Sequence, residues 1–301
     1  EKIINFHTKN TNVKNEYFFN KIEKKLLWDK ITIKYNIGKF SGSFNLSKKL
    51  YLKIKQVNES ILGFFNNFWL SNDLSKNSII FLEFNPAIHS VLFKKLKNYD
   101  GNIILINRRR SAVWNKKSID IVRHSDSKIV NFDRILDKNE KLKLPLLVTD
   151  YSKKLEVFWE NSDFFNNLFQ INDYSFWDII REDLKRKYDE KLSDFIFSIL
   201  SVKKLLAKND VKCIVSLNDV GETEKAFLEF NNEKIPSILL EHGFIERVKE
   251  TKQFDYLDFI YFKGKLAVMG ETRKKWLCEE FNIDPNRIIS LGSPRHDDYF
   301  N

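Results

Sequence analysis

Cysteine is scarce in this chain of 301 residues, which contains only Cys213 and Cys278. They lie far apart, one in a strand-like apolar run and the other in a helix-like run, so a disulfide framework is not indicated. The C-x-x-C and H-x-x-x-H spacings that are common among zinc ligands do not occur. The sequence therefore predicts no metal site.

Long apolar runs are also missing. No run approaches the roughly 18 apolar residues of a transmembrane helix. The first residues, E-K-I-I-N-F-H-T-K-N, lack the apolar core of a signal peptide. We therefore expect a cytoplasmic protein, and peripheral attachment to the inner face of the cell membrane is the alternative that the basic charge allows.

Three common fingerprints of catalytic sites are absent. The sequence contains no G-x-x-x-x-G-K-[ST], no G-x-G-x-x-G and no G-x-S-x-G. Their absence argues against P-loop, dinucleotide-binding and α/β-hydrolase chemistry.

Aromatic residues and lysines, in contrast, are plentiful. The 27 Phe, 10 Tyr and 6 Trp, within a hydrophobic content of 43%, are enough for a sizeable core. The formal net charge of +10 favours anionic partners, such as phosphorylated substrates. The lysines are scattered over many predicted helical faces and form no long block, so we expect no nucleic-acid partner.

From residue 78 onward, short apolar strands alternate with helices. One strand–helix–strand unit takes about 30 residues, which is typical of parallel βαβ connections. We predict an α/β fold, namely a Rossmann-like parallel sheet with flanking helices and a helical insertion at about residues 140–208. The six predicted strands span residues 78–84, 102–107, 213–217, 237–240, 265–269 and 287–291.

The chain is predicted to divide into three parts. Residues 1–79 form a mixed α/β segment packed on the main domain, residues 80–290 form the Rossmann-like domain, and residues 291–301 begin a connection. Within the first part, residues 50–70 are expected to form a helix whose apolar stripe belongs to the core. That stripe consists of Ile54, Val57, Ile61, Phe64, Phe65 and Phe68.

Glycines and polar residues follow the last four predicted strands. Because the carboxyl ends of parallel strands share one edge of a sheet, we expect these loops to surround a ligand. Ordinary turn chemistry, or a helix cap at Asp219, explains any one loop, but four in one sheet favour a pocket. The candidate residues are Asn218, Gly221, Glu222, Glu241, His242, Gly243, Gly270, Glu271, Ser293 and Arg295.

Three consecutive arginines, Arg108, Arg109 and Arg110, come directly after the predicted strand 102–107. Guanidinium groups at the carboxyl end of a strand can bind phosphate or carboxylate in forked geometry. A solvated loop at the sheet edge is the alternative. His89, near the start of the helix that follows the first strand, either faces the same crevice or packs in the core.

Four motifs follow one another in the last third of the chain: N-D-V-G-E-T-E-K-A, I-P-S-I-L-L-E-H-G, M-G-E-T and L-G-S-P-R-H-D. Their order resembles that of GT-B-type glycosyltransferases of capsule and other surface polysaccharide synthesis, and of the related CDP-glycerol glycerophosphotransferases. In those enzymes a Q-H-G or W-H-G element ends a strand of the first Rossmann-like domain. Here Glu241 stands where Gln is commoner in that element. The later W-G-E element of those enzymes reads M-G-E in this chain, with Met269 in place of Trp.

The resemblance implies that the chain is the N-terminal, acceptor-side half of a GT-B enzyme. Such an enzyme transfers a sugar or polyol phosphate from a nucleotide-activated donor to a glycan or lipid-linked acceptor, with no metal and no other cofactor. A second domain that binds the donor is expected beyond Asn301, and the 301 residues alone are expected to be inactive.

The resemblance also implies roles for the candidate residues. His242 is expected to be the base that activates the acceptor hydroxyl, with Glu222 and Glu241 as rival bases or as groups that orient the imidazole. The three arginines are expected to engage an anionic acceptor. Ser293 and Arg295 are expected to line the cleft between the domains.

Two other functions stay open. The first is a non-catalytic α/β binding module, or a half enzyme that acts only with a partner chain. The second is an enzyme similar to nucleotide-sugar epimerases, which share the two-domain architecture.

Overall fold

The chain divides into two units. The α/β unit consists of Val57–Lys141 and Phe197–Asn301, and the helical unit consists of Glu1–Gln56 and Leu142–Ile196. The division predicted from the sequence, at residues 79 and 290, stays a prediction. The computed structural model describes residues 30–37, 40–66, 77–109, 111–219, 221–231, 234–241 and 262–293.

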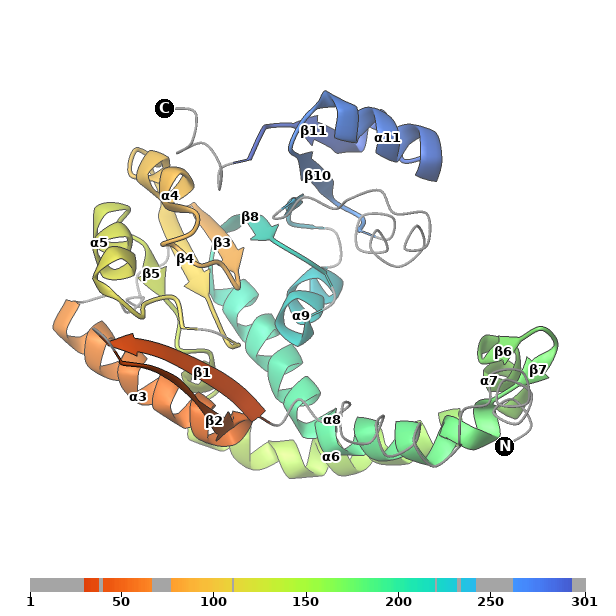
Figure 1. Ribbon diagram of the computed structural model, residues 1–301. Helices are drawn as coiled ribbons and strands as arrows, with labels where there is room; N and C mark the ends of the chain where they lie inside the picture. The colour runs from red at the N-terminus through yellow and green to blue at the C-terminus, as the bar shows by residue number, and fades with distance from the viewer. Residues whose placement is uncertain are drawn as a thin grey trace. The chain divides into compact units, whose positions relative to one another are not determined.

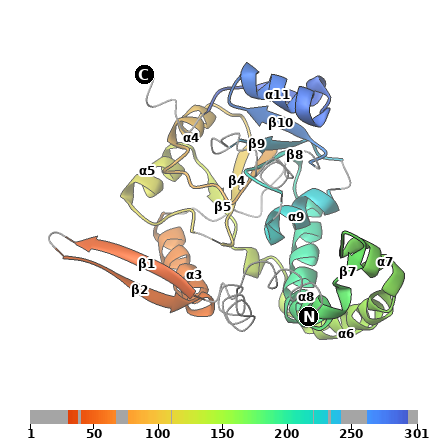
Figure 2. The same ribbon diagram turned by 45° about the vertical axis from the view of Figure 1, so that its right-hand side comes forward.

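The α/β unit is built around a seven-stranded sheet in the order β11-β10-β9-β8-β3-β4-β5 (Figures 1 and 2). Every neighbouring pair in it is parallel. The predicted α/β class with a Rossmann-like parallel sheet is therefore confirmed, while its place in a two-domain GT-B architecture stays a prediction. The strands are β3 Ser78–Leu82, β4 Asn102–Ile106, β5 Lys128–Ile129, β8 Val211–Ser216, β9 Ser237–Leu240, β10 Lys265–Val268 and β11 Ile288–Ser290.

Helices cover both faces of this sheet because its strands are apolar on both sides. On one face Phe81 of β3 packs with Phe93 of α4 and Val122 of α5. On the other face Ile80 of β3 packs with residues of α8 and α9, among them Phe227. The helices are α4 Ser90–Leu96, α5 Lys116–His124, α8 Trp177–Lys208, α9 Glu222–Phe230 and α11 Glu271–Phe281, and η1 (Phe132–Arg134) and η3 (Pro285–Arg287) are short 3-10 turns.

The order of the strands reverses between β3 and β8. From β3 the chain continues to β4 and β5 on one side, and it then returns to β8 on the other side of β3 and continues outward to β9, β10 and β11. Such a switch point opens a crevice outside the carboxyl ends of the two central strands, and ligands of open α/β sheets bind there. Three strands end level with one another at this edge, since Leu82 is the register partner of both Ile106 and Ser216.

Most predicted elements of the α/β unit appear within one or two residues of their predicted bounds. Two of the differences have local reasons. The predicted strand 78–84 ends at Leu82, because Glu83 adopts the left-handed φ of 57°. The two-residue strand β5 was missed, because two residues carry no periodicity.

Within its described residues, the helical unit contains two hairpins and a cluster of aromatic side chains. Within the cluster Phe165 and Trp177 stack with their ring centroids 4.2 Å apart, and Trp159 is also buried there. The hairpin strands are β1 Lys30–Ile37 with β2 Phe40–Ser47, and β6 Gln170–Ile171 with β7 Tyr174–Ser175. The helices α3 Lys48–Asn66, α6 Lys138–Trp159 and α8 run across the division between the two units, and α7 Ser162–Leu168 lies within this one.

The apolar stripe predicted to lie in the core is exposed on α3. Ile54, Val57, Ile61 and Phe64 all have exposed side chains, so the core assignment is wrong for these four. Periodicity shows that a helix has an apolar face, but only packing decides whether that face turns inward. The side chains of Phe65 and Phe68 lie outside the described part of the structure.

None of the helices in the described ranges combines the length and the apolar composition of a membrane span.

Candidate functional site

The polar residues nearest the switch point come from the loops after β3, β4 and β8. Glu83 follows β3 directly, Arg108 and Arg109 follow β4, and Asn218 follows β8. Because these strands end level with one another, their loops meet at one edge of the sheet.

Glu83 organises the loop after β4. Its carboxylate accepts the backbone N–H of Arg108 at 2.7 Å and that of Arg109 at 3.0 Å. Its own backbone N–H donates to the carbonyl of Ile106 at 2.9 Å. The positive φ of Glu83 is sparsely populated by residues other than glycine, asparagine and aspartate, and these hydrogen bonds hold it in place.

Arg109 bridges the two sides of the switch point. Its Nη2 donates to Oε1 of Glu224, on α9, and its Nε lies 3.8 Å from Oε2 of Glu83. The side chain of Glu224 is 0% exposed and that of Glu83 is 5% exposed, whereas that of Arg109 is 50% exposed. The guanidinium therefore neutralises buried charge while one side of it faces solvent.

Glu224 is a fully buried carboxyl group at the third position of α9. Its Oε2 has no hydrogen-bond partner among the described residues. Burial raises the pKa of Glu224 above its ordinary value near 4.5, and the Arg109 guanidinium opposes this rise. A carboxyl group with a raised pKa is better suited to exchanging a proton than an exposed carboxylate with an ordinary pKa.

Gly221 makes room for that carboxyl group. It is the N-cap residue of α9, and a Cβ added there would overlap the Glu224 carboxylate. Its N–H donates to Oδ1 of Asn218 at 3.1 Å, and the hydroxyl of Ser216 donates to the Asn218 carbonyl. The loop after β8 is thus shaped around Glu224.

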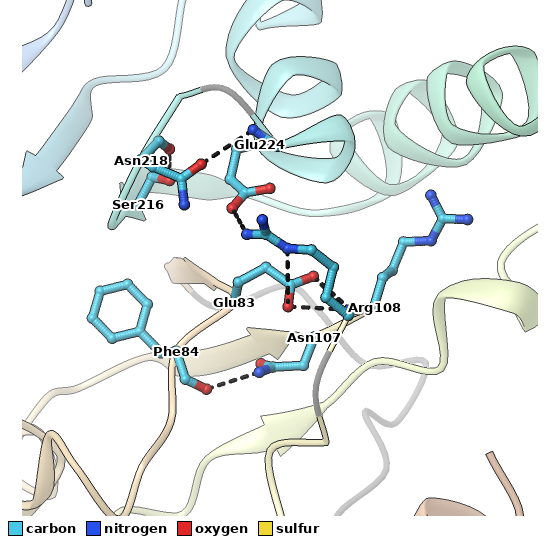
Figure 3. Close-up of polar contacts among 9 residues, drawn as sticks. Glu83, Phe84, Asn107, Arg108, Ser216, Asn218 and Glu224 are labelled. Atoms are coloured by element: carbon cyan, nitrogen blue, oxygen red, sulfur yellow. Dashed lines mark hydrogen bonds and ion pairs between the residues drawn. The ribbon is translucent and has the colours of Figure 1, made fainter. Parts of the chain in front are cut away.

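Arg108 has a different role from Arg109, although the two are adjacent. Its Nη1 donates to the hydroxyl of Ser198 at 2.6 Å, and its guanidinium carbon lies 4.9 Å from the ring centroid of Phe132. Its side chain points away from the two carboxylates (Figure 3). Of the two arginines that the structure describes here, Arg109 has its guanidinium at the switch point and Arg108 does not. The third predicted arginine, Arg110, lies outside the described residues.

Glu241 belongs to a second buried ion pair, further along the sheet. Its Oε2 accepts the N–H of Met269 at 2.8 Å, and its Oε1 accepts Nε of Arg273 at 2.6 Å. Arg273 also lies over the ring of Trp276, 4.9 Å from its centroid. Both carboxylate oxygens are engaged, so Glu241 ties the end of β9 to β10 and α11. His242 and Gly243 follow it in the sequence and lie outside the described residues.

His89 is the N-cap residue of α4 and is buried. Its ring lies 5.0 Å from that of Phe84, and its Nδ1 is 3.1 Å from the carbonyl oxygen of Asn85. This environment is that of a packed, buried side chain.

The other predicted residues lie at the ends of strands and helices. Glu222 and Glu271 are exposed in the first turns of α9 and α11, and Gly270 is the N-cap of α11. Ser293 follows β11, and Arg295 lies outside the described residues. Their predicted roles stay predictions.

Sequence reasoning missed Glu83 and Glu224, and chose Glu222 instead. Helical spacing contained a signal, because Glu224 has Phe227 and Leu228 three and four positions later, whereas Glu222 has Lys225 three positions later. Glu224 thus shares the inward face of α9. For Glu83 no signal existed, since a single carboxylate at the end of a strand is common.

A cavity of about 640 Å³ lies beside α9, and Asp219 of the loop after β8 is among its lining residues. It is lined by residues such as Lys225, Pro236 and Phe262, and by none of the predicted site residues. Within the described ranges no three His, Cys, Asp or Glu side chains come together as metal ligands would.

Comparison with known proteins adds little. No protein-family model and no curated protein matches the chain. Among solved structures, a crystal structure of UDP-GlcNAc 2-epimerase from Neisseria meningitidis bound to UDP-GlcNAc is similar, with 12% identity and a TM-score of 0.40. The alignment covers 74% of this chain and 48% of that one, so the chain spans about half of its length. A likeness this weak supports no conclusion about this chain.

Gly221→Ala should weaken the contact between Glu224 and Arg109, because the new methyl group displaces the carboxylate. We expect it to lower the free energy of unfolding by about 1–3 kcal/mol, the cost of disturbing a buried charged hydrogen bond. Gly270→Ala is the matched control, since Gly270 is also an N-cap glycine but has no heavy atom within 4 Å of an added Cβ. Urea unfolding measures both variants, and an equal decrease in the free energy of unfolding of the two would contradict the steric argument.

Glu224→Gln should change how stability depends on pH. Because burial raises the pKa of Glu224 in the folded state, the wild type loses stability as the pH rises from the ordinary value near 4.5 through the raised value. Glutamine does not titrate, so the free energy of unfolding of the variant should rise relative to that of the wild type over that pH range. Urea unfolding at several pH values measures the difference, with Glu222→Gln as the control for removing a carboxylate from α9. A Glu224→Gln difference that stays constant with pH would refute the raised pKa.

Proposed function

We propose that the α/β unit is the acceptor-binding part of a GT-B-type transferase of surface or capsule polysaccharide synthesis. In this proposal a sugar or polyol phosphate passes from a nucleotide-activated donor to a glycan or lipid-linked acceptor. The donor is bound by a second domain of the complete protein, and the reaction takes place on the cytoplasmic side, where it can reach a lipid-linked acceptor at the membrane.

The observation that carries the proposal is the arrangement of Arg109 between Glu83 and Glu224 at the switch point. Charged groups with so little exposure are costly to keep unless they pair or act on a ligand. Their place, outside the carboxyl ends of β3 and β8, is where ligands bind in open α/β sheets. The motifs that resemble those of GT-B enzymes support the same proposal.

The charge balance of the site favours hydroxyl groups over phosphates. Two carboxylates share one guanidinium, and Glu222 adds an exposed carboxylate to the first turn of α9. Acidic side chains at a helix N-terminus compete with a bound phosphate for the positive end of the helix dipole. A neutral sugar, in contrast, can accept hydrogen bonds from the exposed side of Arg109. This changes the expectation that the arginines engage an anionic acceptor.

The proposed division of labour keeps His242 as the base that removes the proton from the acceptor hydroxyl. A neutral imidazole is suited to this step near neutral pH. Glu241 acts as an anchor for the end of β9, since Met269 and Arg273 engage both its oxygens. Arg109 donates to the acceptor and holds it at the switch point.

Arg109→Ala should weaken the binding of neutral sugars by about 10- to 100-fold, the loss expected for one charged hydrogen bond. Saturation-transfer-difference NMR of the 301-residue chain with a panel of mono- and disaccharides measures this. Arg186→Ala, which removes an exposed arginine of α8, is the control and should bind as the wild type does. Unchanged binding by a folded Arg109→Ala would place the acceptor elsewhere. Tight binding of UDP or CDP that depends on Arg109 would contradict the preference for hydroxyls.

His242→Ala in the complete protein should lower kcat for transfer by about 100- to 10,000-fold, because the acceptor hydroxyl loses its base. The assay supplies nucleotide sugars and CDP-glycerol with an acceptor and follows nucleotide release. Sugar binding measured as above should persist in the variant. Full turnover by His242→Ala would eliminate the assignment, and an epimerised nucleotide sugar formed without acceptor would favour the epimerase alternative.

A further inference from the structure

The cavity beside α9 lies within the α/β unit, because all of its lining residues belong to that unit. Its walls come from the loop after β8, from α9, from the segment that leads into β9 and from the residues directly before β10. Its volume of about 640 Å³ falls within the range of about 300–1,000 Å³ that is usual for small-molecule sites. Glu83, Arg109 and Glu224 are not among the lining residues, so the cavity is separate from the switch point.

Apolar side chains form one part of the wall. Leu228 comes from α9, Ile235 and Pro236 precede β9, and Phe262 precedes β10. Leu228 and Phe262 also pack in the core cluster that contains Leu266, so the core holds them in place. This part of the wall suits the C–H groups of a ligand, which gain free energy when they leave water.

Charged side chains of both signs form another part. Nζ of Lys225 lies 3.6 Å from Oδ2 of Asp219 and 3.7 Å from Oε1 of Glu229. Both distances are longer than an ordinary hydrogen bond of about 2.7–3.2 Å, so the ammonium group can still donate to an oxygen of a ligand. Lys263 is the fourth charged residue of the lining, so two lysines balance two carboxylates.

Two local contacts give the cavity its shape in the absence of a ligand. The N–H of Ile235 donates to Oδ1 of Asn231 at 2.8 Å, and Nδ2 of Asn231 donates to the carbonyl of Ile235. A Cβ added at Gly264 would lie 2.3 Å from the carbonyl oxygen of Ser237, so only glycine lets the start of β10 come this close to β9. The walls are thus formed in advance, as those of ligand sites usually are.

The combination of these walls indicates the class of ligand. A sugar ring has C–H groups on its faces and hydroxyl groups around its edge, and a hydroxyl group both donates and accepts hydrogen bonds. A neutral sugar therefore matches apolar side chains in one part of the wall and a balanced set of lysines and carboxylates in the other. A phosphate group next to Lys225 would meet Asp219 and Glu229, and their like charge opposes its binding.

We propose that this cavity is a carbohydrate-binding site, separate from the switch point, that takes one or two residues of a neutral sugar. The inference goes beyond the proposed function and does not rest on it, because the cavity uses neither Arg109 nor the two carboxylates that Arg109 joins. Lys225 and Asp219 bind the hydroxyl groups, and Ile235 and Pro236 contact the C–H groups.

Methyl NMR of the 301-residue chain tests the proposal. The isoleucine and leucine methyl groups are labelled with carbon-13, and the chain is titrated with a panel of neutral mono- and disaccharides. At least one sugar of the panel should shift the signals of Ile235 and Leu228. Its Kd should rise about tenfold in Lys225→Ala, because a hydrogen bond from a charged donor is lost.

Lys275→Ala is the matched control for this loss. Lys275 lies on α11 and pairs with Glu279 four positions later, as Lys225 pairs with Glu229, but it does not line the cavity. This variant should bind the sugar with the Kd of the wild type.

Pro236→Trp tests the cavity by filling it. Pro236 is exposed, so the larger side chain can extend into the cavity without disturbing the core. The shift of Ile235 on addition of the sugar should disappear, with an unchanged far-UV circular dichroism spectrum. Pro285→Trp, at an exposed proline that does not line the cavity, should bind as the wild type does.

Arg109→Ala distinguishes this site from the one at the switch point. The signal of Ile235 reports on the cavity, so its titration curve should be the same in Arg109→Ala as in the wild type, whether or not sugar binds at the switch point. A curve that depends on Arg109 would overturn the proposal of a separate site. The absence of any shift of Ile235 with the whole panel, or a Kd unchanged in both Lys225→Ala and Pro236→Trp, would overturn it as well. A shift of Ile235 by UDP at lower concentration than by any sugar would overturn the choice of a neutral ligand.

Discussion

One guanidinium between two buried carboxylates is the interaction on which the centre of the α/β unit depends. Arg109 joins the loop after β4 to Glu83, at the end of β3, and to Glu224, on the helix after β8. Two ionised carboxyl groups at such low exposure would otherwise repel each other and pay the full cost of desolvation. Because the Arg109 guanidinium neutralises both carboxylates, the three separate segments can meet at the switch point.

Backbone geometry and electrostatics support each other at this edge. Glu83 adopts a left-handed φ, and its carboxylate accepts the N–H groups of the loop that carries Arg109. Gly221 leaves space that the Glu224 carboxyl group fills. Strained and crowded backbone thus occurs at the switch point, and such backbone is common at ligand sites. A similar device, Glu241 with Arg273, anchors the end of β9 directly before His242.

The polar residues at the switch point and the exposed apolar residues of α3 lie in different parts of the chain. Polar chemistry is gathered at the carboxyl edge of the sheet, where rigid strands position each group. The apolar stripe of α3 contains no chemical groups for catalysis.

The sequence alone determined the succession of strands and helices. β9 has the predicted bounds, because its short apolar run is a local property of the sequence. The sequence also indicated that Arg109 and the loop after β8 lie at one edge. Tertiary structure alone decided which neighbour has which role: Arg109 and not Arg108 at the switch point, Glu224 and not Glu222 inside, and the apolar face of α3 outside. The physical reason is that burial and pairing depend on which segments distant in sequence meet, and local spacing does not contain that information.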